Sequence, residues 1–290
     1  MLEFRRLGRN YAKNMKRMFS AVSNLYASYW SDFFHFAIFE DGESFEEALK
    51  KTHERYISEM HIQNSSEILD LACGRGGFTD LIAQNTKGNV LGVDISEAQL
   101  AHARSHQRKN LEFIACDIMH VNKLQRKFDA VSFLDAACYL PDKRKAIKKI
   151  ANVVNPNGRF LLVDWCMRSG LSRMQEKIVL HPFMRFWAVP NLETQENYET
   201  YLQRYGFRVI DSSVLNDAAR PNWEIGYKNA IKAVQELSFK DIYGLMTKGA
   251  GLKEGLRIIS EQFPAALYIK AGFDSGFLQY VHILAEKSKS

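Results

Sequence analysis

The alternation of apolar and polar positions along the middle of the chain predicts a parallel α/β sheet. Short apolar runs separated by segments long enough for helices occur near residues 67–71, 89–94, 111–116, 128–134 and 158–164. Such alternation is typical of a doubly wound sheet with helices on both faces. Two later runs, at 207–211 and 277–284, predict a sixth and a last strand.

The rest of the chain shows helical spacing. Residues 2–30 place apolar side chains three or four positions apart and predict one amphipathic helix or two, and residues 44–61 predict another with Ser44 as N-cap and Glu47 at the capping-box position. Residues 167–206 and much of the segment between the last two strands also have helical patterns. We therefore expect a helical N-terminal lid (1–60), a core (61–166, 207–214 and 277–290) and a helical substrate cap (167–206 and 215–276).

Composition excludes several classes of protein. The 290 residues, 46% hydrophobic and 25% charged, are ordinary for a soluble globular chain, and the net charge of +6 is spread without an RNA-binding signature. No apolar run reaches the roughly 18–20 residues of a membrane span. Arginines interrupt the first residues where a signal peptide would need an apolar core. We expect a cytoplasmic protein with no nucleic-acid partner and no transmembrane segment.

Four cysteines, Cys73, Cys116, Cys138 and Cys166, lack the close spacing of a zinc site or a disulfide framework. Each follows or ends a predicted strand, so all four lie toward one edge of the sheet in this prediction. Whether they converge in space is left open, and small buried thiols are the preferred interpretation. We predict no metal site.

The predicted N-terminal helix is basic on one face. It carries Arg5, Arg6, Arg9, Lys13, Lys16 and Arg17 against a single acid, Glu3. Contact with a membrane surface and capture of an anionic substrate are two functional interpretations. A solvated face on a packed helix is the structural alternative, and it is the one we favour.

A glycine-rich turn follows the first predicted strand. Asp70 ends that strand, and Gly74, Gly76 and Gly77 precede a helical pattern, which is the local layout of a nucleotide-binding turn. A dinucleotide fold would need a third glycine at Thr79. The carboxylate of Asp70 would also repel a pyrophosphate and favours a cationic ligand. S-adenosylmethionine is such a ligand.

Asp70 to Gly76, read as Asp-x-Ala-x-Gly-x-Gly, resembles the first motif of class I methyltransferases, although Gly is commoner at Ala72. Asp94 ends the second predicted strand, where a carboxylate can bind both ribose hydroxyls, with a helix N-cap as the competing role. Asp117, after the third, resembles the position that meets the adenine amino group. The resemblance implies a Rossmann-like class I methyltransferase fold and a cofactor site at Asp70, Ala72, Gly74, Gly76, Asp94, Ile95, Asp117, Ile118 and Leu134.

Longer stretches resemble the sterol C24-methyltransferases and related isoprenoid C-methyltransferases. Trp30 through Phe36, with Gly-Glu-Ser-Phe at 42–45, is similar to one of their segments, and 128–139 and 163–167 are similar to two others. Asp135 and Asp164 stand where that family has Glu, and Tyr139 stands where it has His. The resemblance implies methyl transfer to a carbon–carbon double bond of a prenyl diphosphate or sterol-like molecule through a carbocation. O- or N-methylation of another small apolar metabolite is the alternative.

That chemistry needs an apolar pocket and one base, and neither a metal nor a covalent nucleophile. Asp135 is the predicted base, with a helix N-cap as its structural alternative, and His35 and Tyr139 are reserve candidates. The aromatic density of 26–39 predicts either core packing or a wall for an apolar acceptor. The predicted substrate-binding residues are Tyr26, Tyr29, Trp30, Phe34, Phe36 and Trp165. A diphosphate with Mg²⁺ and a homo-oligomer are both left open.

Overall fold

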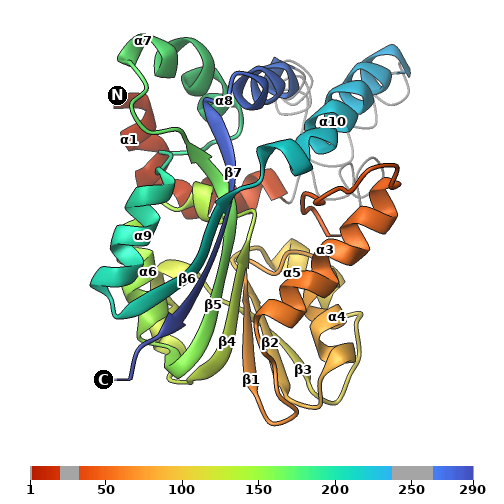
Figure 1. Cartoon of the computed structure of the whole chain (residues 1–290), viewed down its shortest axis with the longest axis vertical. Helices are drawn as coiled ribbons and strands as arrows, with labels where there is room; N and C mark the ends of the chain where they lie inside the picture. The colour runs from red at the N-terminus through yellow and green to blue at the C-terminus, as the bar shows by residue number, and fades with distance from the viewer. Residues whose placement is uncertain (1, 20–32, 237–263, 290) are drawn as a thin grey trace.

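The structure is a computed structural model, and it describes residues 2–19, 33–236 and 264–289 (Figure 1). A seven-stranded sheet runs through the molecule in the order β3-β2-β1-β4-β5-β7-β6. Pairing is parallel from β3 to β5, and β7 is antiparallel to both of its neighbours. The strands are β1 (Glu67–Leu71), β2 (Asn89–Asp94), β3 (Leu111–Ala115), β4 (Phe128–Leu134), β5 (Val154–Met167), β6 (Phe207–Val214) and β7 (Leu278–Lys287).

Helices cover both faces of this sheet. They are α1 (Leu2–Arg9), α3 (Phe45–Glu59), α4 (Gly77–Asn85), α5 (Glu97–Ala103), η1 (Ile118–Leu124), η2 (Ala137–Tyr139), α6 (Lys143–Ala151), α7 (Arg173–Gln175), η3 (Glu176–Leu180), α8 (His181–Phe186), α9 (Gln195–Arg204) and α10 (Asn216–Glu236). Residues 11–19 and 264–274 are also helical. The predicted α/β class and doubly wound, Rossmann-like architecture are confirmed.

Two apolar cores lie on opposite faces of the sheet. One joins strand residues such as Val131 and Leu162 to α6, α9 and η1, and the other joins Ile68 and Leu161 to α3, α4 and α10. The central strands are therefore buried on both sides, which explains their continuous apolar runs. β5 is longer than the predicted 158–164 because it pairs with β4 on one edge and β7 on the other.

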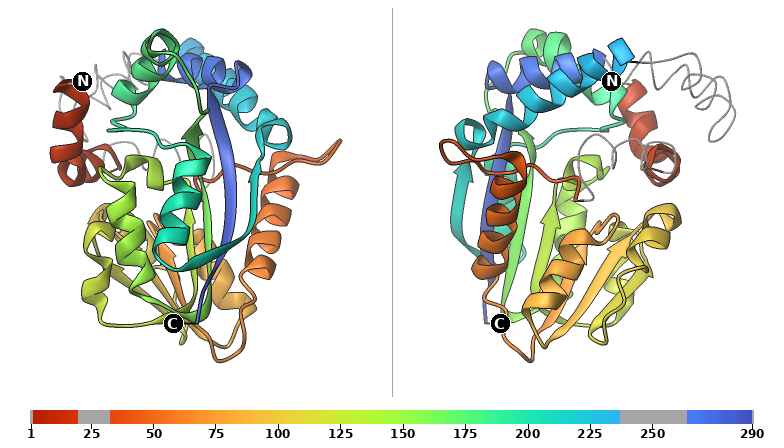
Figure 2. Two further views of the ribbon diagram at one scale, coloured as in Figure 1. Left: turned by 60° about the vertical axis from the view of Figure 1, so that its left-hand side comes forward. Right: turned by 90° about the vertical axis from the view of Figure 1, so that its right-hand side faces the viewer.

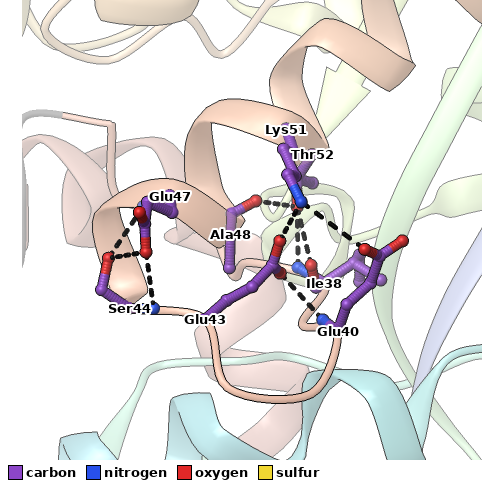
Figure 3. A network of polar contacts seen from close by, with 8 residues as sticks. All are labelled: Ile38, Glu40, Glu43, Ser44, Glu47, Ala48, Lys51 and Thr52. Carbon is purple, nitrogen blue, oxygen red and sulfur yellow. Dashed lines mark hydrogen bonds and ion pairs between the residues drawn. The ribbon is translucent and has the colours of Figure 1, made fainter.

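The start of α3 follows the sequence prediction. Ser44 and Glu47 form both bonds of a capping box, and the Glu43 carboxylate pairs with Lys51 in the second turn of the helix (Figure 3). The hydroxyl of the next residue, Thr52, accepts a hydrogen bond from the Ile38 N–H at 2.7 Å. This contact fixes the segment before α3 against the helix and directs it toward the end of the sheet where the site lies.

The carboxyl ends of the parallel strands face a group of helices. Figures 1 and 2 show α7, α8, α10 and the helix 264–274 at this end, with α1 and the helix 11–19 to one side. Pro182 lies in the first turn of α8, which directly follows the π-helical turn η3. Within the described residues, no helix is long and apolar enough to cross a membrane.

Candidate functional site

The turn between β1 and α4 is built on left-handed backbone. Ala72, Gly74 and Gly76 have φ angles of +56°, +54° and +84°. A Cβ at Gly76 would lie 2.8 Å from the Phe113 ring, so this position needs glycine for space as well as for conformation. Ala72 adopts the same conformation with a side chain, which explains why glycine is the commoner residue in the motif that it resembles.

Asp70 is buried behind this turn. Its carboxylate accepts hydrogen bonds from Thr79 Oγ1 at 2.6 Å and from Ser132 Oγ at 2.8 Å. The pKa of Asp70 is raised to about 6. Burial is the main cause and the charge of the nearby Asp94 adds to it, while the hydrogen bonds from the two hydroxyls lower the pKa. Asp70 thus joins β1 to α4 and β4, and it leaves a negative charge beneath the turn that favours a cationic ligand.

Asp94 ends β2 on the other side of the turn. One carboxylate oxygen accepts the Gly74 N–H at 3.0 Å and the other accepts the Ser96 N–H at 2.7 Å. Ser96 is the N-cap of α5 but makes no side-chain cap bond. Burial raises the pKa of Asp94. Each oxygen keeps a lone pair after it has accepted its backbone hydrogen bond, so the carboxylate can still accept hydrogen bonds from the two hydroxyls of a ribose.

Asp117 follows β3 and caps η1. It accepts the Met119 N–H at 2.8 Å and a hydrogen bond from the hydroxyl of Tyr11. Ile118, which follows it, is buried. No sequence signal pairs Tyr11 with Asp117, because a tyrosine on an amphipathic helix is most often a packing residue.

The helix 11–19 lies over this group of strand ends. Met15 and Met18 are 4% and 5% exposed, and they pack with Ile95 and Tyr139. The ring of Phe19 meets that of Tyr139 edge-on at 5.9 Å. The helix therefore contacts three of the predicted site residues, Ile95, Tyr139 and Asp117, and covers the site from one side.

Asp135 directly follows β4 with a φ of +52°, which is strained for a residue with a side chain. Its Oδ2 accepts the Phe36 N–H and the Tyr280 hydroxyl, both at 3.1 Å. Its Oδ1 is buried and receives no hydrogen bond from the described residues. The expected alternative as a helix N-cap is absent, since η2 begins after Ala136 and has no side-chain cap.

The pKa of Asp135 is raised to about 8, chiefly by burial and also by the charge of Asp164. The Phe36 N–H and the Tyr280 hydroxyl act in the opposite direction, as does the indole of Trp165. The indole N–H of Trp165 therefore lies close enough to act on the Asp135 carboxyl, although it is buried and makes no hydrogen bond of normal geometry with a described residue. A carboxyl with a free buried oxygen and a raised pKa has the properties of a proton acceptor.

Aromatic rings surround this carboxyl. Phe36 packs against Trp165 with ring centroids 5.1 Å apart and against Tyr280 at 5.2 Å. The cluster continues through Phe183 of α8, Trp223 of α10 and Phe273 of the helix 264–274. Two of the predicted substrate residues, Phe36 and Trp165, are therefore beside Asp135. Phe34 is partly buried at a φ of +54°, and Tyr26, Tyr29 and Trp30 lie outside the described residues.

His35 contacts a second histidine. Its Nδ1 lies 3.0 Å from His53 Nε2, and the rings of both pack against Phe78. Burial lowers the pKa of His35 to about 3, so the imidazole is neutral at physiological pH. A neutral imidazole that is already joined to another is a weaker candidate for proton transfer than Asp135.

A buried lysine supports the same strand ends. Lys143 Nζ donates to the carbonyls of Cys138, Leu140 and Asn191 at 2.7–2.9 Å. Burial lowers its pKa to about 8, and the pKa of Asp164, which accepts the Tyr198 hydroxyl, is raised to about 6. In the sequence Lys143 is one of several basic residues in a helix, so only the structure distinguishes it.

The four cysteines are free thiols, Cys138 and Cys166 fully inside the protein and Cys73 and Cys116 partly so. Burial raises the pKa of Cys138 and of Cys166, which keeps both thiols protonated. In the part of the chain that the structure describes, no three His, Cys, Asp or Glu side chains are placed to hold a metal ion.

Comparison with known families identifies this arrangement. The model of the family described as "Methyltransferase domain" matches residues 62–206, which carry the glycine turn, the strand-end acids and Asp135. The chain belongs to the methyltransferase domain family. The prediction of a methyltransferase that uses S-adenosylmethionine is confirmed, and the carboxylates around the glycine turn suit that cationic cofactor.

Two sequence relatives extend this finding. The methyltransferase is 25% identical over 287 residues to 24-methylenesterol C-methyltransferase 2 of Arabidopsis thaliana, covering 94% of its own length and 77% of the relative. It is 28% identical over 246 residues to sterol 24-C-methyltransferase of Saccharomyces cerevisiae, covering 81% and 63%. The predicted resemblance to sterol C24-methyltransferases is therefore confirmed.

Solved structures show the same fold. The cyclase SpnF superposes with a TM-score of 0.76 at 17% identity, covering 96% of the methyltransferase and 97% of SpnF. Geranyl diphosphate C-methyltransferase of Streptomyces coelicolor A3(2) superposes with a TM-score of 0.67 at 15% identity, covering 96% and 97%. At these identities the likeness concerns the fold alone.

Tyr11→Phe is expected to release the helix 11–19 from the site. The substitution removes one hydrogen bond to a carboxylate, worth about 1.5–3 kcal/mol, which corresponds to roughly a tenfold or greater rise in local opening. Trypsin cleavage after Lys13 and Lys16 should accelerate by that factor. Tyr205→Phe is the matched control, since its hydroxyl makes no contact with Asp117, and equal cleavage of the two variants would contradict the role of Tyr11.

The pH dependence of kcat/KM is expected to report Asp135. A base with a raised pKa is protonated and inactive below that pKa, so kcat/KM should rise with pH and level off above about 8. The charge of Asp164 raises the pKa of this carboxyl and the Tyr280 hydroxyl lowers it, and the Asp135 charge in turn raises the pKa of Tyr280 and of Tyr56. A profile that is flat from pH 6 to 9 (roughly two units around the pKa) would contradict this assignment.

Proposed function

We propose that this methyltransferase adds a methyl group to a carbon–carbon double bond of an isoprenoid, a prenyl diphosphate or a sterol-like molecule. The observation that carries the proposal is Asp135. It combines a strained backbone, a free buried oxygen and a raised pKa with a wall of aromatic rings around Phe36 and Trp165. O- and N-methylation do not need a carbocation to be shielded, whereas alkene methylation does.

S-adenosylmethionine supplies an electrophilic methyl group. The residues proposed to hold this cofactor are Asp70, Asp94 and Asp117 with the turn from Ala72 to Gly76, together with Ile95, Ile118 and Leu134. The π electrons of the acceptor would form the new bond to the methyl carbon as its bond to sulfur breaks, which would release S-adenosylhomocysteine and leave a cation on the neighbouring carbon of the acceptor. Loss of a proton from an adjacent carbon to the Asp135 carboxylate restores a double bond.

The aromatic residues have two tasks in this scheme. Their ring faces stabilise the positive charge on the acceptor, each by about 0.5–2 kcal/mol. They also exclude water, which would otherwise add to the cation and end the reaction as an alcohol. Phe36 and Trp165 are positioned for both tasks, since their rings pack against each other and both residues adjoin the Asp135 carboxyl.

The comparisons support this acceptor class. The relatives carry sterol C-methyltransferase names, and one structural neighbour is a geranyl diphosphate C-methyltransferase in complex with Mg²⁺, geranyl diphosphate and S-adenosyl-L-homocysteine. The chain spans 77% and 63% of the two sterol enzymes, so the choice between a diphosphate and a sterol-like acceptor is left to experiment. A methyltransferase for oxygen or nitrogen of another apolar metabolite is the second candidate, supported by the family-wide cofactor site.

We also propose the division into a lid, a core and a cap. The helix 11–19 suits a lid, because it covers the strand ends through Tyr11 and its methionines. The segment around Ala37 is tied to α10, because the Ala37 N–H donates to Asn222 Oδ1 at 2.8 Å, so the proposed lid movement is that of the helix 11–19. A cytoplasmic location and an apolar small-molecule partner complete the proposal.

An acceptor screen tests the proposed function. Purified protein with methyl-labelled S-adenosylmethionine is supplied with geranyl diphosphate, a Δ24-sterol, a phenol and a secondary amine. Label transfer to one of the two alkenes is expected. Transfer only to the phenol or the amine would establish the second candidate and remove the role of Asp135 as the base for a carbocation.

A further inference from the structure

The turn formed by α7 and η3 exposes large apolar side chains at the site end of the molecule. Met174 is 65% exposed and Ile178 is 59% exposed, more than any other large apolar residue in the part of the chain that is described. Arg173 and Lys177 beside them are also exposed. We call these four residues the α7 face. Single exposed apolar residues are common in soluble proteins, whereas Met174 and Ile178 lie only four residues apart and each has a cation beside it.

The spacing places the α7 face on one side of its helix. Residues four positions apart share one face of a helix, which aligns Met174 of α7 with Ile178 of η3 and Arg173 of α7 with Lys177 of η3. The opposite side of the segment is core, since Leu180 is 1% exposed and Leu171 and Val179 pack against the cluster that contains Trp165. The segment is therefore amphipathic, and nothing in the described part of the chain covers its outer side.

The charge around this face is positive. Arg173 and Lys177 form no ion pair with an acidic side chain among the described residues, and Glu176 between them is partly buried. The ring of Phe4 in α1 packs against His181, the first residue of α8, with the ring centroids 4.8 Å apart. Through that contact α1 brings Arg5, Arg6 and Arg9 to the same end of the molecule.

We infer that the α7 face docks the enzyme on an anionic lipid surface. Met174 and Ile178 enter the boundary between head groups and acyl chains, and Arg173 and Lys177 pair with lipid phosphates. The arginines of α1 add attraction at longer range. This role goes beyond the proposed function, which requires no membrane. It would also bring the cap, whose helices carry Phe183 and Phe273, next to the phase in which an apolar acceptor dissolves.

The experiment is cosedimentation of the full chain with vesicles, so it does not depend on the acceptor. Wild type is expected to bind vesicles of phosphatidylcholine with phosphatidylglycerol and to remain in solution with phosphatidylcholine alone. The double variant Met174→Ser/Ile178→Ser should lose about tenfold or more in partitioning, because two apolar side chains no longer enter the lipid. Arg173→Gln/Lys177→Gln should weaken binding and flatten its dependence on salt.

Ile210→Ser is the matched control, because Ile210 is 38% exposed on β6, away from the α7 face. It should partition as wild type does, and all variants should keep their affinity for S-adenosylmethionine. Equal partitioning of the double variant and wild type would overturn the inference, as would absence of wild-type binding to the anionic vesicles. If light scattering showed an oligomer that the double variant loses, the face would be a protein interface instead.

Discussion

Asp135→Asn is expected to lose turnover by roughly 10²–10⁴-fold, the usual effect of removing a positioned acid or base. The amide keeps the shape of the side chain and can still accept the Phe36 N–H and the Tyr280 hydroxyl, but it cannot take a proton. Affinity for S-adenosylmethionine, measured by calorimetry, should not change. The loss should therefore appear in kcat at saturating cofactor and acceptor.

Asp142→Asn is the control for this variant. Asp142 caps α6 by accepting the Lys145 N–H at 2.8 Å, and asparagine is an equally good cap, so its turnover should match wild type. Near-normal turnover of Asp135→Asn would remove Asp135 from the chemistry and assign it to the packing of Phe36 against β7.

The same substitution is expected to stabilise the protein at high pH. A carboxyl whose pKa is raised on folding binds a proton more tightly in the folded state, so it contributes stability at low pH that is lost as pH rises toward about 8. Asparagine does not titrate. Between pH 5 and pH 8.5 (roughly the span between the unfolded and folded pKa values), the Tm of wild type should therefore fall relative to the Tm of Asp135→Asn. A Tm difference that stays constant over this range would contradict the raised pKa.

Asp94→Ala is expected to weaken S-adenosylmethionine binding by an order of magnitude or more. Hydrogen bonds to a charged group are worth about 1.5–3 kcal/mol, and the variant also leaves the Gly74 and Ser96 N–H groups without their acceptor. The glycine turn then loses part of its fixed geometry. Calorimetric titration with S-adenosylmethionine and with S-adenosylhomocysteine measures both effects.

Asp129→Ala separates this effect from a general loss of stability. Asp129 accepts the Glu67 N–H at 2.9 Å and the Asn155 side chain at 2.7 Å, but it lies at the opposite end of the strands. The Asp129→Ala variant should have a lower Tm than wild type and the same affinity for S-adenosylmethionine. If Asp94→Ala bound the cofactor as tightly as Asp129→Ala does, the ribose assignment would be lost.

The strands and the cofactor turn could be predicted from the sequence because their signals are local. Apolar runs defined β1, β2 and β4 at the residues where the structure has them. The glycines lie within a few positions of Asp70, and Asp94 and Asp117 are each recognised by their place at the end of a predicted strand. The sequence indicated the positive φ of Ala72 only indirectly, because Ala72 stands where the methyltransferase motif more often has Gly. The length of β5 was not visible, because it depends on pairing with β7, more than a hundred residues later in the chain.

The partners of the site residues could not be predicted, since each comes from a distant part of the chain. Tyr280 reaches Asp135 across the antiparallel end of the sheet, and Tyr11 reaches Asp117 from the N-terminal helix. Both tyrosines have ordinary neighbours in the sequence. Asp135 itself had two equal interpretations, and only the missing cap bond and the free Oδ1 favour a chemical role over a structural one.

The position of the transferred methyl group tests the central claim most directly. Wild-type protein is incubated with S-adenosylmethionine carrying a trideuterated methyl group and the alkene accepted in the screen, and the product is analysed by NMR and mass spectrometry. We predict a trideuteromethyl group on a former alkene carbon, with one proton lost from an adjacent carbon. A trideuteromethyl group bound to oxygen or nitrogen would contradict alkene methylation.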